Sequence, residues 1–251
     1  MSLDQQIIWN ELASVDVDAS AAFYQELFGW TIREEERDTY LHFYIGDKTV
    51  AGLSALHGDQ PPHWQVFIGT SDAEAYAARA KAAGGHAVTP LMDIPHTGRI
   101  QYWADPEGAV LAAFEPSSPE RDSWGNSGAP GHFCWVELMC DDPSQALSFY
   151  KRAVEWDVMP MAVGDIDYNL VLKKGGGQQD AAGGVMRKME PGPSVWLPYV
   201  SVADVDASAQ KAGDLGAQIL QPATDVGDFG RCAVFMDPGG AVLAIYQAKN
   251  C

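Results

Sequence analysis

The chain repeats itself, and this repeat constrains its fold more than any other feature of the sequence. The segment Trp9–Trp30 agrees with the segment Trp135–Trp156 at a constant offset of 126 positions, with Trp, Glu, Asp, Phe and Tyr residues in register. Further along, the offset is 132 positions. At this offset, the segment DPEGAVLA that begins at Asp105 aligns with the segment DPGGAVLA that begins at Asp237. Composition alone does not produce so many identities at fixed offsets. The sequence therefore predicts a tandem duplication.

The stretch between the two copies has the composition of a linker. It reads EPSSPERDSWGNSGAPG from Glu115 to Gly131, and it is rich in Ser, Pro, Gly and charged residues. Such stretches connect compact domains more often than they fold into them. We therefore expect a first domain at residues 4–116, a linker at 117–131 and a second domain at 132–249, and we call the two domain sequences the first and second copy.

Within each copy, hydrophobic periodicity predicts the order strand, helix and three strands, and this order occurs twice. A strand over Ile7–Ala13 leads through Asp16, a helix-capping residue type, into a helix. The apolar stripe predicted for this helix is Ala22, Phe23, Leu27 and Phe28. The other elements predicted for the first copy are strands at Tyr40–Ile45, Thr49–Leu56, Trp64–Ile68, His86–Thr89, Arg99–Ala104 and Val110–Phe114, and a helix at Asp72–Ala83. This alternation indicates an α+β fold of curved mixed sheets with helices on their outer faces.

The composition excludes several classes of partner. The chain has 16 Lys and Arg residues against 34 Asp and Glu residues, which gives a formal charge of −18. Nucleic acids and anionic membranes both select basic surfaces, so neither is an expected partner. No apolar run reaches the roughly 18 residues of a membrane span, and the four cysteines have no metal-ligand spacing. We expect a cytoplasmic protein that is a monomer or a homodimer.

Three motifs lead to a family resemblance. They are FYQELFGW at Phe23–Trp30, AKAAGG at Ala80–Gly85, and the DPEG and DPGG turns that begin at Asp105 and Asp237. In both copies the chain resembles the vicinal-oxygen-chelate superfamily, which includes glyoxalase I, bleomycin-resistance proteins and extradiol dioxygenases. The resemblance implies that each domain consists of two βαβββ modules whose curved mixed sheet surrounds a cavity that takes a small-molecule ligand. The motifs are packing and turn elements, so they indicate the fold rather than an activity.

The chemistry of this family normally uses a divalent metal, and the sequence departs from the family at the metal-ligand positions. By the resemblance, these positions are Trp9, Gly52, Trp64/Gln65 and Ala112 in the first copy, and Trp135, Gly184, Trp196/Leu197 and Ala244 in the second. Indole, methyl and hydrogen side chains offer no lone pair to a metal, and a single amide does not hold one. We therefore expect no metal and no other cofactor.

Strand alternation places Trp9 and Glu11 on the face that the resemblance assigns to the cavity, and Glu137 takes the equivalent place in the second copy. Desolvation beside an indole raises the pKa of a carboxyl group toward the range useful for acid–base catalysis. The alternative is a structural role, in which each glutamate accepts hydrogen bonds from the facing module or pairs with Arg99 or Arg231.

On the next strand, Tyr40, His42 and Tyr44 share one face, which the resemblance also turns toward the cavity. The second copy has Tyr168, Leu170 and Leu172 at these positions, so its cavity is predicted to be apolar. We predict Glu11 as the acid–base group, with His42 and Tyr40 orienting the substrate, although a strand histidine is more often structural. The predicted binding residues are Trp9, Tyr44, Gln65, Phe67, Tyr102, Trp135, Glu137 and Tyr168.

Two functions remain open at this point. The first is a metal-free, glyoxalase-like or bleomycin-resistance-like protein that binds or transforms a small carbonyl or aromatic metabolite; as an enzyme, it would be a lyase, an isomerase or a hydroxylase. The second is a binding protein that sequesters an antibiotic-type small molecule without turning it over. The first requires that Glu11 transfers protons, whereas the second requires only a fitted surface.

Overall fold

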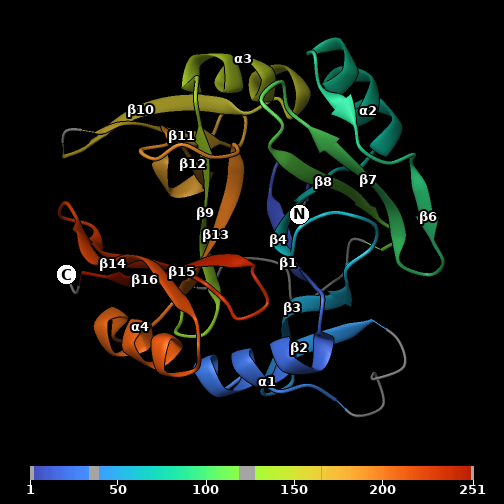
Figure 1. Cartoon of the computed structure of the whole chain (residues 1–251). Coiled ribbons are helices and arrows are strands. Elements are labelled where there is room, and N and C mark those ends of the chain that lie inside the picture. Colours follow the sequence, from blue (N-terminus) through green and yellow to red (C-terminus); the bar gives the residue numbers. More distant parts are fainter. Residues whose placement is uncertain (1–2, 34–39, 119–127, 165, 250–251) are drawn as a thin grey trace. The chain divides into compact units, whose positions relative to one another are not determined.

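The computed structural model describes residues 3–33, 40–118, 128–164 and 166–249. Within these ranges the chain forms four α-helices and sixteen strands, which make two mixed sheets of eight strands each (Figure 1). The predicted α+β fold is therefore confirmed. No helix in the described ranges is long and apolar enough to cross a membrane.

The first sheet is built from the first copy alone. Its elements are β1 (Ile7–Ser14), α1 (Val17–Phe28), β2 (Leu41–Ile45), β3 (Lys48–Ala55), β4 (His63–Gly69), α2 (Ala73–Ala82), β5 (His86–Ala87), β6 (Met92–Ile94), β7 (Gly98–Ala104) and β8 (Val110–Pro116). The strand order is β2-β3-β1-β4-β8-β7-β5, and β6 also pairs with β7. Strand β1 is parallel to β3 and β4 is parallel to β8, whereas the β2–β3 and β7–β8 pairs are antiparallel.

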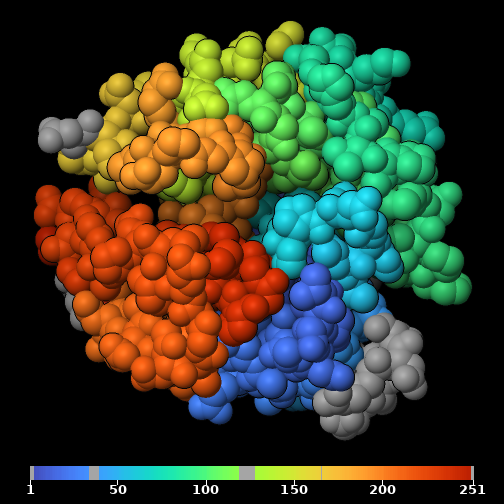
Figure 2. Space-filling view, in the orientation of Figure 1, coloured from blue at the N-terminus to red at the C-terminus, as the bar shows by residue number. Residues whose placement is uncertain are grey.

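The second sheet repeats this pattern with the second copy. Its elements are β9 (Phe133–Cys140), α3 (Pro143–Ala153), β10 (Asp157–Val163), β11 (Ile166–Leu172), β12 (Ala181–Arg187), β13 (Val195–Ser201), α4 (Val205–Asp214), β14 (Gln218–Val226), β15 (Gly230–Met236) and β16 (Val242–Ala248). The strand order is β10-β11-β12-β9-β13-β16-β15-β14. The long strand β14 corresponds to β5 and β6, which are separate in the first copy. The sequence did not predict β6, whose three residues are exposed at the surface (Figure 2).

Each helix begins at an aspartate, which explains why the sequence locates the helices well. The side chains of Asp16, Asp72 and Asp204 each accept a hydrogen bond from the backbone N–H three residues later, at 2.9 Å. Asp142 accepts from the backbone N–H groups of Ser144 and Gln145, at 3.0 and 3.2 Å. These bonds satisfy backbone donors that have no partner within the helix.

The stripe predicted for α1 was partly wrong. Ala22 is exposed and Phe28 is only half-buried, and the residues that α1 buries are Ser20, Ala21, Phe23, Tyr24 and Leu27. The buried stripe is rotated because Tyr24, which a count of apolar residues leaves out, has a hydrogen-bonded hydroxyl in the core. Such a tyrosine is as suitable for the interior as phenylalanine.

The chain divides into two compact units, and neither unit is a sequence copy. Unit 1 consists of Met1–Ile8, Val66–Trp124 and Val136–Trp196, and unit 2 consists of Trp9–Gln65, Gly125–Trp135 and Leu197–Cys251. Each unit thus combines one module of the first copy with one module of the second. The domain boundaries expected from the repeat remain a prediction, and residues 119–127 of the expected linker lie outside the described residues.

The core of unit 2 contains a buried hydrogen-bonded triad. The Tyr24 hydroxyl donates to Asp237 Oδ2 at 2.8 Å and accepts from Trp64 Nε1 at 2.9 Å. The backbone N–H of Ala241 donates to the other carboxylate oxygen of Asp237 at 2.9 Å. Burial, together with the charge of Asp237, raises the pKa of Tyr24 well above its ordinary value. The tyrosine therefore stays protonated and holds the aspartate in place.

Unit 1 contains the same triad. The Tyr150 hydroxyl donates to Asp105 Oδ2 at 3.0 Å and accepts from Trp196 Nε1 at 2.8 Å. Burial raises the pKa of the Asp105 carboxyl group, although hydrogen bonds from Ala109 and Tyr150 oppose this effect. The residues that repeat most clearly in the sequence are therefore packing and turn elements, as predicted.

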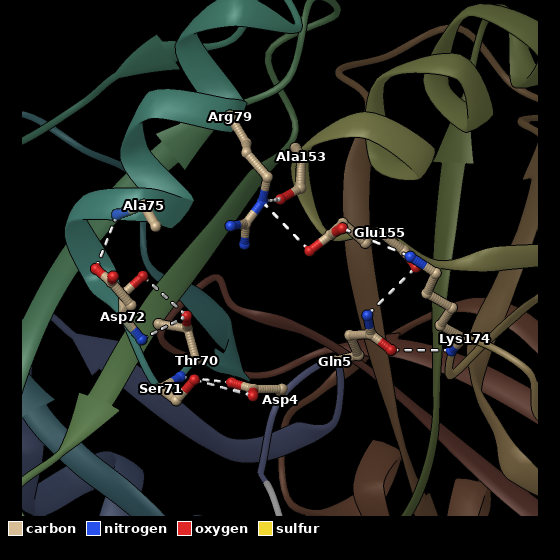
Figure 3. A network of polar contacts seen from close by, with 10 residues as sticks. All are labelled: Asp4, Gln5, Thr70, Ser71, Asp72, Ala75, Arg79, Ala153, Glu155 and Lys174. Atoms are coloured by element: carbon tan, nitrogen blue, oxygen red, sulfur yellow. Dashed lines mark hydrogen bonds and ion pairs between the residues drawn. The ribbon is translucent and has the colours of Figure 1, made fainter.

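A surface network fixes the beginning of the chain within unit 1 (Figure 3). The Gln5 side chain donates to the Glu155 carbonyl at 3.3 Å and accepts from the Lys174 backbone N–H at 2.9 Å. Arg79 donates to the carbonyl of Ala153 at 3.2 Å and lies 3.7 Å from the Glu155 carboxylate. This network joins α2 to the segment after α3, which belongs to the other copy.

Candidate functional site

The predicted catalytic residues lie in unit 2: Glu11 in β1, His42 in β2, and Tyr40 directly before β2. Leu12 and Leu53 belong to the hydrophobic core that also contains the buried side of α1. Because side chains alternate along a strand, Glu11 and Gly52 point to the opposite face. Glu11 of β1 is aligned with Gly52 on the neighbouring strand β3, and Gly52 is aligned with His42 on the next strand, β2. The sheet thus places these positions side by side, away from α1.

Two hydroxyl groups hold the Glu11 carboxylate. Tyr40 Oη donates to Glu11 Oε2 at 2.6 Å, and Ser54 Oγ donates to Glu11 Oε1 at 2.7 Å. Trp9 Nε1 in turn donates to Tyr40 Oη at 3.0 Å. Lengths of about 2.5–2.7 Å are typical of hydroxyl donors to a charged carboxylate. The half-buried Glu11 side chain is therefore fixed at both oxygens.

Three aromatic rings pack around His42, which lies on the strand beyond Gly52. The centroid of the imidazole lies 5.0 Å from the Tyr40 ring, 6.0 Å from the Trp9 ring and 6.1 Å from the Tyr44 ring. The contacts with Trp9 and Tyr40 are edge-on, and Arg33 Cζ lies 4.0 Å from the centroid of Tyr44. The structure thus brings together Trp9, Glu11, Tyr40, His42 and Tyr44, all of which the sequence singled out.

Gly52 makes room for the phenol of Tyr40. A Cβ atom at this position would lie 1.7 Å from Tyr40 Oη and 3.0 Å from Trp9 Nε1. The second copy repeats the arrangement, because a Cβ atom on Gly184 would lie 1.8 Å from Tyr168 Oη. The repeat revealed both glycines, but the sequence did not show that each one lies beneath a tyrosine.

The equivalent cluster in unit 1 has diverged toward an apolar one. Glu137 is opposite Gly184, as Glu11 is opposite Gly52, but only 8% of the Glu137 side chain is exposed. Leu170 takes the place of His42 opposite the glycine. Met186 takes the place of Ser54 on the adjacent strand. Tyr168 and Glu137 are retained, whereas the imidazole and the second hydroxyl are lost.

The other predicted binding residues lie on other strands of the two sheets. Gln65 is buried in β4 of unit 2, and Trp135 is half-buried in β9. In unit 1, Phe67 of β4 and Tyr102 of β7 have ring centroids 6.3 Å apart, and both are aligned with Ala112 of β8.

The structural alternative for Glu11 needs a correction. The hydroxyl donors that hold this carboxylate come from its own module, since Tyr40 directly precedes β2 and Ser54 lies in β3. They do not come from the facing module. The sequence missed Ser54 altogether, because a lone strand serine carries no pattern.

The arginines considered as partners bind other carboxylates. Arg99 Nη2 lies 2.6 Å from Glu115 and its Nη1 lies 3.1 Å from Glu74. Arg231 pairs with Asp206, the equivalent of Glu74, at 3.0 Å and with Asp225 of β14 at 2.5 Å. Both arginines therefore support the packing of a helix against its sheet.

The side chains at the family's metal positions do not fit a divalent cation. The Trp9 indole uses its only polar group, Nε1–H, as a donor to Tyr40,. The phenol of Tyr40 lies across Gly52, and Ala112 has only a methyl group. Across the described residues, no group of three or more His, Cys, Asp or Glu side chains is placed to hold a metal ion. We therefore derive no chemistry through a metal in this chain.

Comparison with known families agrees with this fold. A model described as Glyoxalase/Bleomycin resistance protein/Dioxygenase superfamily matches residues 6–112. A model described as Glyoxalase-like domain matches residues 135–246. The matches cover the two copies and leave out the stretch between them.

Curated relatives match the chain along almost its whole length. "Putative glyoxylase CFP32" of Mycobacterium tuberculosis (strain CDC 1551 / Oshkosh) is 30% identical over 248 residues, which cover 95% of this chain and 93% of that protein. "Anthracycline biosynthesis protein DauV" of Streptomyces sp. (strain C5) is 30% identical over 263 residues, which cover 96% of this chain and 93% of that protein.

Solved structures share the fold at lower identity. The Mn(II)-bound glyoxalase from Novosphingobium aromaticivorans has a TM-score of 0.66 at 17% identity, over 98% of this chain and 83% of that chain. The 2,2',3-trihydroxybiphenyl 1,2-dioxygenase from Sphingomonas wittichii strain RW1 has a TM-score of 0.64 at 12% identity, over 98% of this chain and 90% of that chain. The chain belongs to the glyoxalase/bleomycin resistance/dioxygenase superfamily, with one family domain in each of its two tandem regions.

Proposed function

We propose that this chain binds a small carbonyl or aromatic metabolite against the Glu11 face of β1–β3 and transforms it by acid–base chemistry, without a divalent metal. The observation that carries the proposal is the Glu11 carboxylate, which is half-buried beside aromatic rings and fixed at both oxygens by Tyr40 and Ser54. A carboxylate that is oriented in this way is suited to take a proton from a bound substrate.

The proposed chemistry needs few groups. Each carboxylate oxygen has two acceptor positions, and one hydroxyl occupies only one of them. Glu11 therefore retains acceptor capacity toward a ligand. It would remove a proton from a hydroxyl-bearing carbon next to a carbonyl group. The electron pair of that C–H bond would form the C=C bond of an enediolate, and the π pair of the C=O bond would move to the carbonyl oxygen. His42 would donate a hydrogen bond to this oxygen. Return of the proton to the former carbonyl carbon, while the hydroxyl proton passes to the first oxygen and the hydroxyl-bearing carbon becomes the new carbonyl, would complete an isomerisation.

The relatives support the choice of substrate class. One is named as a glyoxylase, and another is named for anthracycline biosynthesis. Trp9, Tyr40 and Tyr44 offer ring surfaces that suit a flat ligand. The same rings favour a second candidate function, sequestration of an aromatic compound without turnover, because binding needs only these surfaces.

The test compares binding and turnover in the same preparations. The probes are 1,4-dihydroxyanthraquinone and methylglyoxal with glutathione; binding is read from tryptophan fluorescence and products from mass spectrometry. Glu11→Gln should retain binding and lower kcat by about 100-fold or more. Glu26→Gln, which removes a surface carboxylate of α1 beside Lys211, is the matched control and should match the wild type.

Three outcomes would contradict the proposal. Full turnover in Glu11→Gln would remove the acid–base role, and tight binding without any product would favour sequestration. Loss of turnover in EDTA with recovery in Mn²⁺ would show that a metal takes part. The cytoplasmic location and the monomeric or homodimeric state remain part of the proposal; cell fractionation and light scattering of the intact protein test them.

A further inference from the structure

Both copies carry the same glutamate and the same tyrosine above a glycine, yet they differ in the second hydroxyl donor. Ser54 donates to Glu11 Oε1 at 2.7 Å. Its equivalent in the second copy, Met186, is buried and has only a thioether, which cannot donate a hydrogen bond,. The first copy alone therefore combines the carboxylate with a serine.

We propose that Ser54 is a positioning residue, which fixes the plane of the Glu11 carboxylate so that it presents a defined acceptor to the ligand. This inference rests on the proposed acid–base role of Glu11. Nothing in the sequence repeat or in the family resemblance points to Ser54, and the repeat would instead suggest that its position is freely exchanged for an apolar residue.

The geometry gives Ser54 a task that Tyr40 cannot perform alone. Tyr40 reaches Oε2 from the chain before β2, whereas Ser54 reaches Oε1 from β3, where it is aligned with Ala13 of β1. One hydrogen bond leaves a carboxylate free to rotate about the bonded oxygen. Two bonds from different strands remove this rotation, because the strands are themselves fixed by the sheet.

Fixing the carboxylate should affect the rate more than the binding of the ligand. Proton transfer depends on the distance and the angle between the carboxylate oxygen and the C–H bond, and a small misplacement lowers the rate steeply. Ligand affinity comes mainly from the aromatic surfaces of Trp9 and Tyr44. The hydrogen bond described for the Ser54 hydroxyl goes to Glu11 and not to either of these residues. A role in packing alone would instead lower stability and leave kcat unchanged.

The experiment uses the full-length protein and four variants. Ser54→Ala removes the hydroxyl, and Ser54→Thr restores one on a side chain that is well suited to a strand. Ser201→Ala is the matched control, because Ser201 is a buried strand serine of the same unit whose hydroxyl donates to the Gly128 carbonyl at 2.9 Å. Glu11→Gln is the reference for loss of the acid–base group.

Turnover is again measured with methylglyoxal and glutathione, and 1,4-dihydroxyanthraquinone serves as the binding probe; kcat, KM and the thermal midpoint are measured for each variant, and the pH profile of kcat is recorded. We expect Ser54→Ala to lower kcat by about 10- to 100-fold, as expected for the loss of a hydrogen bond to a charged group. KM should change by less than about twofold because uniform binding is untouched.

The controls separate this inference from the proposed function. Ser54→Thr should recover most of the lost rate, and Ser201→Ala should lower the thermal midpoint while kcat and the pH profile stay as in the wild type. If Glu11→Gln loses turnover and Ser54→Ala does not, the positioning role is wrong and the proposed function stands. If the wild type does not convert methylglyoxal with glutathione, or Glu11→Gln is as active as the wild type, both are overturned.

Discussion

Substitution of Gly52 by alanine tests whether the site is built as described. A Cβ atom there would lie 1.7 Å from Tyr40 Oη, 2.5 Å from Tyr40 Cζ and 3.0 Å from Trp9 Nε1. No contact between non-bonded atoms is that short, so the phenol of Tyr40 has to leave its position. Its hydrogen bonds to Glu11 and from Trp9 are then broken.

The expected loss of stability follows from these two bonds. A hydrogen bond to a charged group contributes about 1.5–3 kcal/mol and a neutral one about 0.5–1.5 kcal/mol. Replacing glycine by alanine stabilises the folded state by about 0.4–1 kcal/mol, because it lowers the conformational entropy of the unfolded chain. Since Glu11 and Tyr40 are half-buried, hydrogen bonds to water compensate for part of the lost stabilisation. We expect the free energy of unfolding to fall by about 1–2 kcal/mol.

The assay is urea unfolding of four proteins: the wild type, Gly52→Ala, Tyr40→Ala and the double variant. Once Tyr40 is shortened, the alanine at position 52 has no phenol to displace, so the second substitution should be neutral or slightly stabilising. A Gly52→Ala effect of the same size with and without the tyrosine would refute the reasoning. Gly184→Ala offers a comparison in the second copy; there Tyr168 is only 8% exposed, and the loss should be larger because the phenol has less room to move.

Three further results are expected. Tyr150→Phe should lower the free energy of unfolding by about 1–3 kcal/mol, because the buried groups of Asp105 and Trp196 both lose a partner; urea unfolding that leaves stability unchanged would contradict the triad,. The raised pKa of Asp105 means that the folded state binds more protons than the unfolded state between the ordinary and the raised pKa, so this group makes stability fall as pH rises through that window,. Asp105→Asn should remove this contribution, and unfolding curves that have the same pH dependence in both proteins would exclude it. Burial raises the pKa of the Cys134 and Cys140 thiols to about 12 in each case, so both should resist iodoacetamide at pH 8 in the native protein and react in urea, as mass spectrometry can show.

The local elements could be read from the sequence because their causes are local. The aspartates that cap α1 and α2 and the alternation along β1 depend on neighbouring residues only. The same alternation placed Glu11 and His42 on one face, and this part of the site was visible for the same reason. Strand β6 was not predicted, because its three exposed residues give no hydrophobic pattern.

The contacts of the site depended on which strands lie side by side. Ser54 meets Glu11 because β3 is parallel to β1 with Ala13 aligned with Ser54. Tyr40 reaches the same carboxylate only because Gly52 has no side chain in its path. The sequence offered the facing module and an arginine as partners, and neither supplies the two donors.

The sequence by itself determined the duplication, the α+β class, the limits of α2 to within one residue and the family. Only the tertiary structure decided which modules form one compact unit. Tyr24 binds Asp237, 213 positions away, whereas the sequence contains an equivalent aspartate at Asp105 within its own copy. A duplicated chain presents the same packing face twice, so pairing within a copy and pairing between copies satisfy the same residue pattern. The sequence pattern therefore does not distinguish the two pairings, and the tertiary contacts do.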